Sequence, residues 1–294
     1  MNILSYPKFI RPVISFFLCI ISIFLSLGDK PIIPHGKEID MSKFELTWAD
    51  EFDGDSLDLS KWGAHYFNNG ETAVRRGGYW DLKLATVADG NLHIATKFYP
   101  EGLDGNGKPG WYTCGIDTKK AFEQKHGYFE VRCILPKGVG QWSAFWMLCD
   151  SMSLTENGGK DGAEIDIFES CFYSKEGMAR NSVSSNIHIN GYGDAHEAEN
   201  VCDALVTANN PYEEFNTYGL EWDEDGYIFY INGVETGRSS FGGVSEVPEW
   251  LILSVEVDGA DGVPADGWSG PSIENNTEPL TDFVVDYVRA YQYK

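Results

Sequence analysis

The sequence predicts an all-β protein, and three observations carry that prediction. From Phe44 onwards the chain of 294 residues shows short β-prone runs between turns, with almost no sustained helical periodicity. Its 32 glycines and 12 prolines suit many turns. Apolar residues make up 43% of the chain and aromatic residues 14%, which is ample material for a core. We therefore expect a sandwich or barrel of short strands, forming one domain over residues 43–294.

The N-terminal segment has the pattern of a signal peptide. Lys8 and Arg11 give it a positive start, and Val13 to Leu27 is an apolar run of about 15 residues broken only by serines. That run is shorter than the ~20 residues that a membrane span needs. We expect a signal peptide over 1–28 and a linker over 29–42, with an uncleaved membrane anchor as the alternative. The protein would then be secreted or periplasmic, with no membrane contact after cleavage.

The expected strands are runs of β-branched and aromatic residues bounded by turn-forming residues. In order they are Phe44 to Trp48, Leu92 to Thr96, Gly127 to Leu135, Trp142 to Leu148, Gly162 to Ser170, Val183 to Ile189, Tyr218 to Trp222, Tyr227 to Ile231, Glu249 to Val257 and Phe283 to Tyr293. Residues 99–110, 190–214 and 258–280 are expected as loops. Sequential strands are usually neighbours in a sheet, so strand 142–148 should lie beside strand 162–170.

Strand 162–170 carries three carboxylates among apolar residues. Glu164 and Asp166 share one face because side chains alternate with period 2. Glu169 has the wrong parity by one residue, and a β-bulge with Phe168 as the extra residue would return it to that face. Like charges in line are destabilising, which argues against the alternative of an ordinary exposed acidic strand. Glycoside hydrolysis uses a carboxylate pair, about 5–5.5 Å apart when a covalent intermediate forms. The spacing favours this retaining geometry over an inverting one.

The net charge of the chain limits the classes of molecule that it is expected to bind. A formal net charge of −23 argues against nucleic acid, whose binders carry basic patches. A neutral polysaccharide is the easier partner, although a local basic patch could accept an anionic one. No histidine–carboxylate spacing in the sequence is typical of a metal centre.

Tryptophans supply candidate sugar platforms. Trp142 and Trp146 lie four apart on one strand face, so they serve either as core residues or as platforms beside Glu164. Trp111 and Trp268 lie in loop-like contexts and are further candidates, as is Trp80. His188 is a lone histidine on a strand, where a structural role competes with a role in the site.

Five cysteines follow the N-terminal segment. They are Cys114, Cys133, Cys149, Cys171 and Cys202. An odd number in an exported protein leaves at least one thiol free or bonded to another molecule. Cys171, two residues past Glu169, is expected as a small buried side chain, with a nucleophile as the alternative.

Most of residues 46–294 resemble glycoside hydrolase family 16. The segments that carry the resemblance are Leu46 to Phe52, Asp89 to Leu92, Tyr112 to Gly115, Gly127 to Arg132, Trp142 to Met147, Leu220 to Trp222 and Asp286 to Tyr291. The acid motif Glu-x-Asp-x-x-Glu at 164–169 is the strongest match, and its extra residue is similar to the laminarinase-like and agarase-like branches. Ser143 departs from the laminarinase pattern, which has proline there. The stretch 65–87, with Arg75-Arg76, matches no branch cleanly.

The resemblance implies a β-jelly-roll sandwich with a concave glycan cleft and a retaining mechanism. Glu164 would be the nucleophile, Glu169 the general acid/base, and Asp166 the residue that holds Glu164. Trp142, Trp146 and His188 fall where the family places cleft residues. The family needs no cofactor for chemistry, and many members bind a structural calcium ion. Here that ion would involve Glu51, Gly90 and Asp286, which offer the oxygen ligands that calcium prefers.

The expected function is an endo-acting β-glycanase that cleaves β-1,3- or mixed-linked β-1,3/1,4-glucan, working as a monomer. One alternative is an endo-β-galactosidase on agar-, keratan- or mucin-type glycans. Another is a glycan-binding protein without activity, but related recognition proteins typically lose the catalytic acids, and all three are present here.

Overall fold

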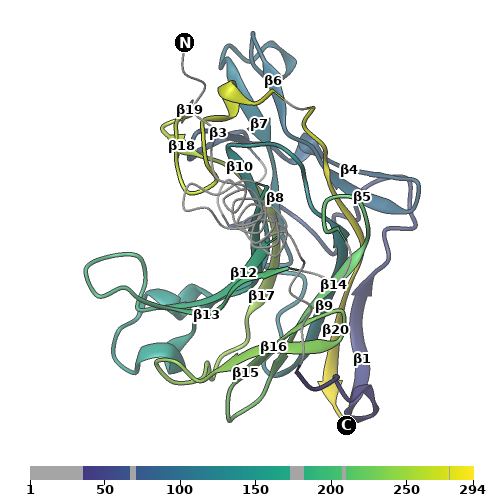
Figure 1. The fold of residues 1–294 in the computed structure, drawn as a ribbon, viewed down its shortest axis with the longest axis vertical. Helices are drawn as coiled ribbons and strands as arrows, with labels where there is room; N and C mark the ends of the chain where they lie inside the picture. The colour runs from purple at the N-terminus through teal and green to yellow at the C-terminus, as the bar shows by residue number, and fades with distance from the viewer. Residues whose placement is uncertain (1–35, 67–70, 173–181, 207–209, 278) are drawn as a thin grey trace, which may run out of the picture.

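The computed structural model describes residues 36–66, 71–172, 182–206, 210–277 and 279–294. The predicted signal peptide and most of the predicted linker lie outside these described residues. Two antiparallel sheets pack into a sandwich, and the prediction of an all-β fold is confirmed (Figure 1). Within the described part of the chain, no helix has the length and apolar character of a membrane span.

The first sheet has eight strands. Their order is β16-β15-β14-β9-β20-β5-β4, and β1 and β5 pair with different parts of β20 on one side, opposite β9. Figure 1 shows β1 in purple beside β20 in yellow. The bounds are β1 (Phe44–Asp50), β4 (Ala85–Ala88), β5 (Asn91–Ile94), β9 (Gly127–Ile134), β14 (Asn216–Trp222), β15 (Tyr227–Ile231), β16 (Val234–Ser239) and β20 (Phe283–Tyr293).

The second sheet has six strands in the order β13-β12-β11-β10-β17-β8. Their bounds are β8 (Gly115–Asp117), β10 (Gln141–Leu148), β11 (Glu164–Cys171), β12 (Ser182–Ile189), β13 (Glu197–Val206) and β17 (Trp250–Val257). Strand β10 pairs with β11, as the sequence predicted for segments 142–148 and 162–170. This sheet carries the three acids on β11.

Smaller elements complete the fold. Strands β2 (Ala73–Arg75), β3 (Gly78–Trp80), β6 (Lys97–Tyr99) and β7 (Gly110–Thr113) form a separate sheet, and β18 (Gly259–Ala260) pairs with β19 (Val263–Pro264). The short 3₁₀ helices are η1 (Met41–Lys43), η2 (Leu82–Leu84), η3 (Leu103–Gly105), η4 (Asp150–Ser153), η5 (Gly158–Asp161) and η6 (Ile273–Asn275).

The prediction of loops over 190–214 and 258–280 was wrong in part. The first contains β13, and the second contains β18, β19 and η6. Strand β13 begins Glu-Ala-Glu-Asn and, among the described strands, pairs with β12 alone at the edge of its sheet. Edge strands tolerate charged residues, so β13 lacks the apolar alternation by which strands are found in a sequence.

The core lies between the two sheets. Phe129 and Val131 of β9 meet Phe145 and Met147 of β10 in one large cluster, and all four are fully buried. The intervening residues of β10 point the other way, where Trp146 belongs to a second apolar cluster. Period-2 alternation therefore gives β10 one face toward the core and one face toward the acids.

All five cysteines of the described chain are buried free thiols. Burial raises the pKa of the Cys171 thiol to about 12, with the Glu169 charge adding to the effect. A thiol that stays protonated is a poor nucleophile, which favours the structural interpretation of Cys171.

Candidate active site

The site forms where β11 lies between β10 and β12. Its register pairs Glu164 with His188 of β12, and Asp166 with both Trp146 of β10 and Asn186 of β12. Gly162 lets the chain enter this strand, because its φ of +126° favours glycine and a Cβ there would lie 2.0 Å from the Cys149 sulfur.

The predicted β-bulge is present, but its position differs from the prediction by one residue. Along β10 the register passes from Phe145–Phe168 to Trp146–Asp166, which leaves Ile167 without a partner. The extra residue is therefore Ile167 and not Phe168. Both side chains enter the core, and Phe168 packs 4.4 Å from Tyr218 between ring centroids. The larger ring keeps the paired position, because it makes the better contact across the sandwich.

The bulge brings the three acids to one pocket. Glu164, Asp166 and Glu169 all line a cavity of about 400 Å³ together with Trp142 and Trp146. A larger hollow of about 590 Å³ lies elsewhere, beside β15 and β16, and contains none of these residues. The aligned acids identify the smaller cavity as the candidate active site.

Burial and mutual repulsion set the protonation of the acids. Burial, followed by the charges of Asp166 and Glu164, raises the pKa of Glu169 to about 8. Burial, followed by the charge of Glu164, also raises the pKa of Asp166 well above its usual value. Glu169 therefore keeps a proton at neutral pH, as a general acid must.

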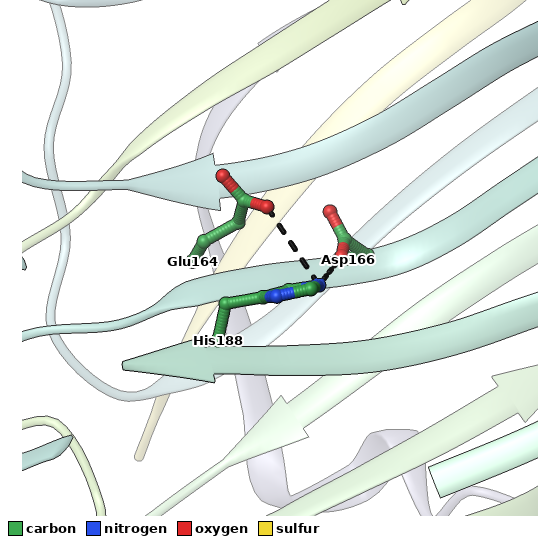
Figure 2. A group of neighbouring side chains, drawn as sticks. All are labelled: Glu164, Asp166 and His188. Atoms are coloured by element: carbon green, nitrogen blue, oxygen red, sulfur yellow. Dashed lines mark ion pairs between the residues drawn. The ribbon is translucent and has the colours of Figure 1, made fainter. Parts of the chain in front are cut away.

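His188 belongs to this site and is not an isolated structural histidine. Its Nε2 lies 3.3 Å from Asp166 Oδ2 and 3.9 Å from Glu164 Oε1. Figure 2 shows the imidazole edge turned toward both carboxylates. On its other side, Nδ1 lies 2.9 Å from Nε2 of His196, so a proton is shared between the two rings. The imidazole edge of His188 thus lies close to both acids, and His196 supports it from behind.

Two asparagines support Glu169, and sequence reasoning missed both. Asn186 Nδ2 donates to Glu169 Oε2 at 2.9 Å, and Asn200 Nδ2 donates to Asn186 Oδ1 at 2.8 Å. This chain of amides fixes which way Asn186 points. The parity of Asn186 with His188 on β12 was the available signal, but the partner strand β13 was not predicted.

The predicted platforms divide into two groups. Trp142 and Trp146 line the pocket, although each is only 5% exposed, and Trp146 Nε1 donates to Ser254 Oγ at 3.1 Å. Trp268 meets Trp142 edge-on at 5.5 Å and is 38% exposed, so it extends the aromatic surface. Trp111 contacts Phe98 on the small sheet and is absent from the pocket lining.

Arginine side chains reach the pocket of this acidic protein. Arg75 Nη2 lies 2.7 Å from Glu256 Oε1, and Arg76 lies over the Trp142 ring at 4.9 Å. Glu256 is buried on β17, opposite Trp142 of β10. Arg75 and Arg76 lie in a stretch of the sequence that shows no strand alternation. Their position beside the acids therefore could not be predicted from the sequence.

The proposed calcium residues Glu51, Gly90 and Asp286 come from neighbouring stretches, but the two side chains among them are engaged. Glu51 accepts two hydrogen bonds from Arg289, and Asp286 is paired with Arg132. The set fits calcium only through backbone oxygens, so this site stays a prediction. Among the described residues, the side chains with metal-like spacing are Glu164, Asp166 and His188, within 4.8 Å of one another. We assign no metal there, because the two carboxylates have roles in glycoside chemistry.

Comparison with known proteins covers most of the chain. A relative from Niallia circulans, "Glucan endo-1,3-beta-glucosidase A1", is 27% identical over 90% of this chain and 41% of its own length. "Beta-porphyranase E" of Zobellia galactanivorans is 30% identical over 64% of this chain and 65% of its own. This chain spans 39 to 53% of the length of three curated relatives that it matches.

The fold is shared with solved structures. The structure of SCLam, described as a non-specific endo-β-1,3(4)-glucanase, superimposes with a TM-score of 0.65 at 24% identity, covering 90% of this chain and 98% of that one. The family model "Beta-porphyranase A-D, GH16 domain" matches residues 45–293, the whole sandwich with its acid strand. This chain therefore belongs to glycoside hydrolase family 16.

Proposed function

We propose that this chain is an endo-acting retaining β-glycanase that hydrolyses β-1,3- or mixed-linked β-1,3/1,4-glucan. The observation that carries the proposal is the pairing of Glu169, whose pKa of about 8 keeps it protonated, with Glu164 in the same pocket. Double displacement requires one carboxylic acid and one carboxylate that flank the scissile glycosidic bond. Family membership and the glucanase names of several relatives support the substrate class.

The reaction has two steps. In the first, Glu164 forms a bond to the anomeric carbon while Glu169 gives its proton to the glycosidic oxygen, and the glycosidic bond breaks. In the second, Glu169 takes a proton from water, the water oxygen bonds to the anomeric carbon, and Glu164 leaves as a carboxylate. By the family resemblance, Asp166 would hold Glu164 in place between the steps. Trp142 and Trp146 would receive the apolar faces of sugar rings.

A second candidate is an endo-β-galactosidase that acts on an agar-type galactan. It is favoured by the porphyranase description of the matching family model and by the arginines Arg75 and Arg76 at the pocket. Guanidinium groups bind anionic oxygens in a fixed geometry, and some galactans carry such groups. Several relatives are named for action on glucan, whereas one is named a porphyranase, so we place glucan first.

Product analysis on a glycan panel tests the proposal. The full chain would be incubated with laminarin, mixed-linkage glucan, agarose, porphyran, carrageenan, keratan sulfate and mucin glycans, with mass spectrometry of released oligosaccharides. Glu164→Gln should abolish release, and Glu45→Gln, an exposed residue of β1, is the matched control. Short products from a glucan support the first candidate. Release only from galactans replaces it with the second, and binding without any release would indicate a recognition protein.

We also propose that the protein is exported and monomeric. The basic and apolar pattern of residues 1–28 supports export, and the polysaccharide substrate class requires contact with polymers outside the cell. N-terminal sequencing of protein recovered from the medium or periplasm should begin near residue 29. Size-exclusion chromatography with light scattering should give the mass of one chain.

A further inference from the structure

The turn between β12 and β13 places two side chains against the catalytic centre. The Tyr192 hydroxyl donates a hydrogen bond to Glu164 Oε2. From the same turn, His196 stacks on His188 with ring centroids 5.1 Å apart and an interplanar angle of 8°. The Tyr192 residue is 61% exposed, so its ring stands at the rim of the site while its hydroxyl points inward to the acid.

Tyr66 reaches the same place from the opposite side. Its backbone N–H donates to the Asp117 carboxylate of β8 at 3.0 Å, and its ring lies 6.3 Å from Trp146 and 6.0 Å from Trp250. Its hydroxyl is hydrogen-bonded with Tyr192. In the sheet order, β8 and β17 lie on one side of β11, whereas β12 and β13 lie on the other. The two tyrosines therefore meet at Glu164 from opposite sides.

This arrangement treats the two oxygens of Glu164 differently. Oε2 accepts the bond from Tyr192, while Oε1 faces His188 and receives no hydrogen bond from the described residues. A hydrogen bond to a carboxylate is charge-assisted and favours the ionised form. It also limits rotation of the carboxylate, so that one oxygen stays directed to the reacting carbon.

We propose that Tyr192, supported by Tyr66, is a positioning residue for Glu164, which holds Oε2 by a hydrogen bond and leaves Oε1 free to attack. The inference rests on the proposed function, in which Glu164 is the nucleophile. Tyr192 lies in an exposed turn, outside the acid motif, and its sequence context gives no sign of a role in the reaction.

Carboxyl NMR tests the contact without any substrate. Spectra would be recorded of protein labelled with ¹³C at the glutamate carboxyl carbons, with the Glu164 signal assigned from Glu164→Gln. In Tyr192→Phe, the Glu164 carboxyl signal should change its chemical shift, because the hydrogen bond to Oε2 is lost. The other groups that act around this carboxylate are unchanged in the comparison: they are Asp166, Glu169, His188, Tyr66, Arg75, Arg76 and Glu256.

Tyr287→Phe is the matched control, because the Tyr287 hydroxyl also donates to a glutamate, Glu130, at 2.8 Å, but on the other sheet. It should leave the Glu164 carboxyl signal unchanged. An unchanged Glu164 signal in Tyr192→Phe would overturn the proposal, even if glycans are cleaved. Failure of the wild type to cleave any glycan, with the Glu164 signal moved in Tyr192→Phe, would instead overturn the proposed function alone.

Kinetics give a second readout once a substrate is known. Tyr192→Phe should lower kcat by about tenfold while KM changes little, because the bond acts on the reacting group and not on the bound chain. Tyr66→Phe should show the same changes more weakly. A rise in KM with kcat unchanged would mean that Tyr192 only contacts substrate, which would overturn the positioning role.

Discussion

Glu169 is a carboxylic acid that holds its proton at neutral pH, and this property governs how the enzyme should respond to pH. Its pKa of about 8 arises first from burial and then from the charges of Asp166 and Glu164. A general acid works only while protonated, so kcat/KM should be sustained below that value and fall as the pH rises through about 8. Initial rates on a glucan across the pH range measure this. A fall already complete at neutral pH would contradict the assignment.

The charge of Glu164 also controls the proton of Glu169. Replacing Glu164 by Gln removes a negative charge that raises the Glu169 pKa, so we expect that pKa to fall by about one unit. Titration of ¹³C-labelled glutamate carboxyl groups, followed by NMR, reads the change, and Glu45→Gln should leave it unaltered. During the reaction Glu164 becomes an ester and loses its charge, which should lower the pKa of Glu169 and favour its ionised form, the form that can take a proton from water. A pKa that rises or stays fixed in Glu164→Gln would refute this coupling.

At the level of the strand, the bulge in β11 aligns the acids. The sequence was sufficient to predict it, because the third acid has the wrong parity for a regular strand. It was not sufficient to choose between Ile167 and Phe168, since both are apolar and either would correct the parity. Which of the two residues is the extra one depends on their contacts across the sandwich, where the Phe168 ring packs on Tyr218.

Single-residue deletions test which residue is the extra one. Deleting Ile167 should remove the bulge but preserve the Phe168–Tyr218 contact and the common face of the acids. Deleting Phe168 should destabilise the protein by roughly 1–2 kcal/mol more, because it removes the ring that also lies 6.2 Å from Phe283. Urea unfolding of both variants gives the comparison. Equal losses, or a greater loss without Ile167, would argue against the observed register.

For the whole molecule, the class of fold could be predicted but the rim of the cleft could not. Strands such as β9 and β10 can be recognised in the sequence by their β-prone residues. The three aligned acids of β11 identify the chemistry of the site. Tyr192, His196 and Arg76 reach the site from connections and short strands whose sequences have no period to read. Their positions follow only from how the sheets and loops close around β11, which is a property of the assembled molecule.

Buried acids also set how the stability of the whole molecule depends on pH. Glu249 is fully buried, and burial raises its pKa to about 8, although hydrogen bonds from Ser245 and the Ala163 N–H oppose the rise. The folded state thus holds a proton that the unfolded state releases near the ordinary value of 4.5. Stability from this group is present below that value and is lost as the pH rises toward about 8.

Glu249→Gln separates this contribution from the rest. Glutamine keeps an acceptor for Ala163 but cannot ionise, so the decline in the free energy of unfolding between about pH 5 and about pH 8 should shrink by on the order of a few kcal/mol. Urea unfolding at several pH values measures the slope. The exposed Glu45→Gln should keep the wild-type slope, and a steeper decline in Glu249→Gln would show that the sign is wrong.

The five buried thiols have a practical consequence for anyone who produces this protein. Because the described domain is held together without a cross-link, its folding should need neither an oxidising compartment nor a disulfide isomerase. Material made in a reducing bacterial cytoplasm should match material recovered after export. Melting curves with and without a strong reductant should coincide, whereas a lower melting temperature under reduction would reveal a bond. The same thiols, being hidden from solvent, would report unfolding directly through their reaction with a thiol-specific dye.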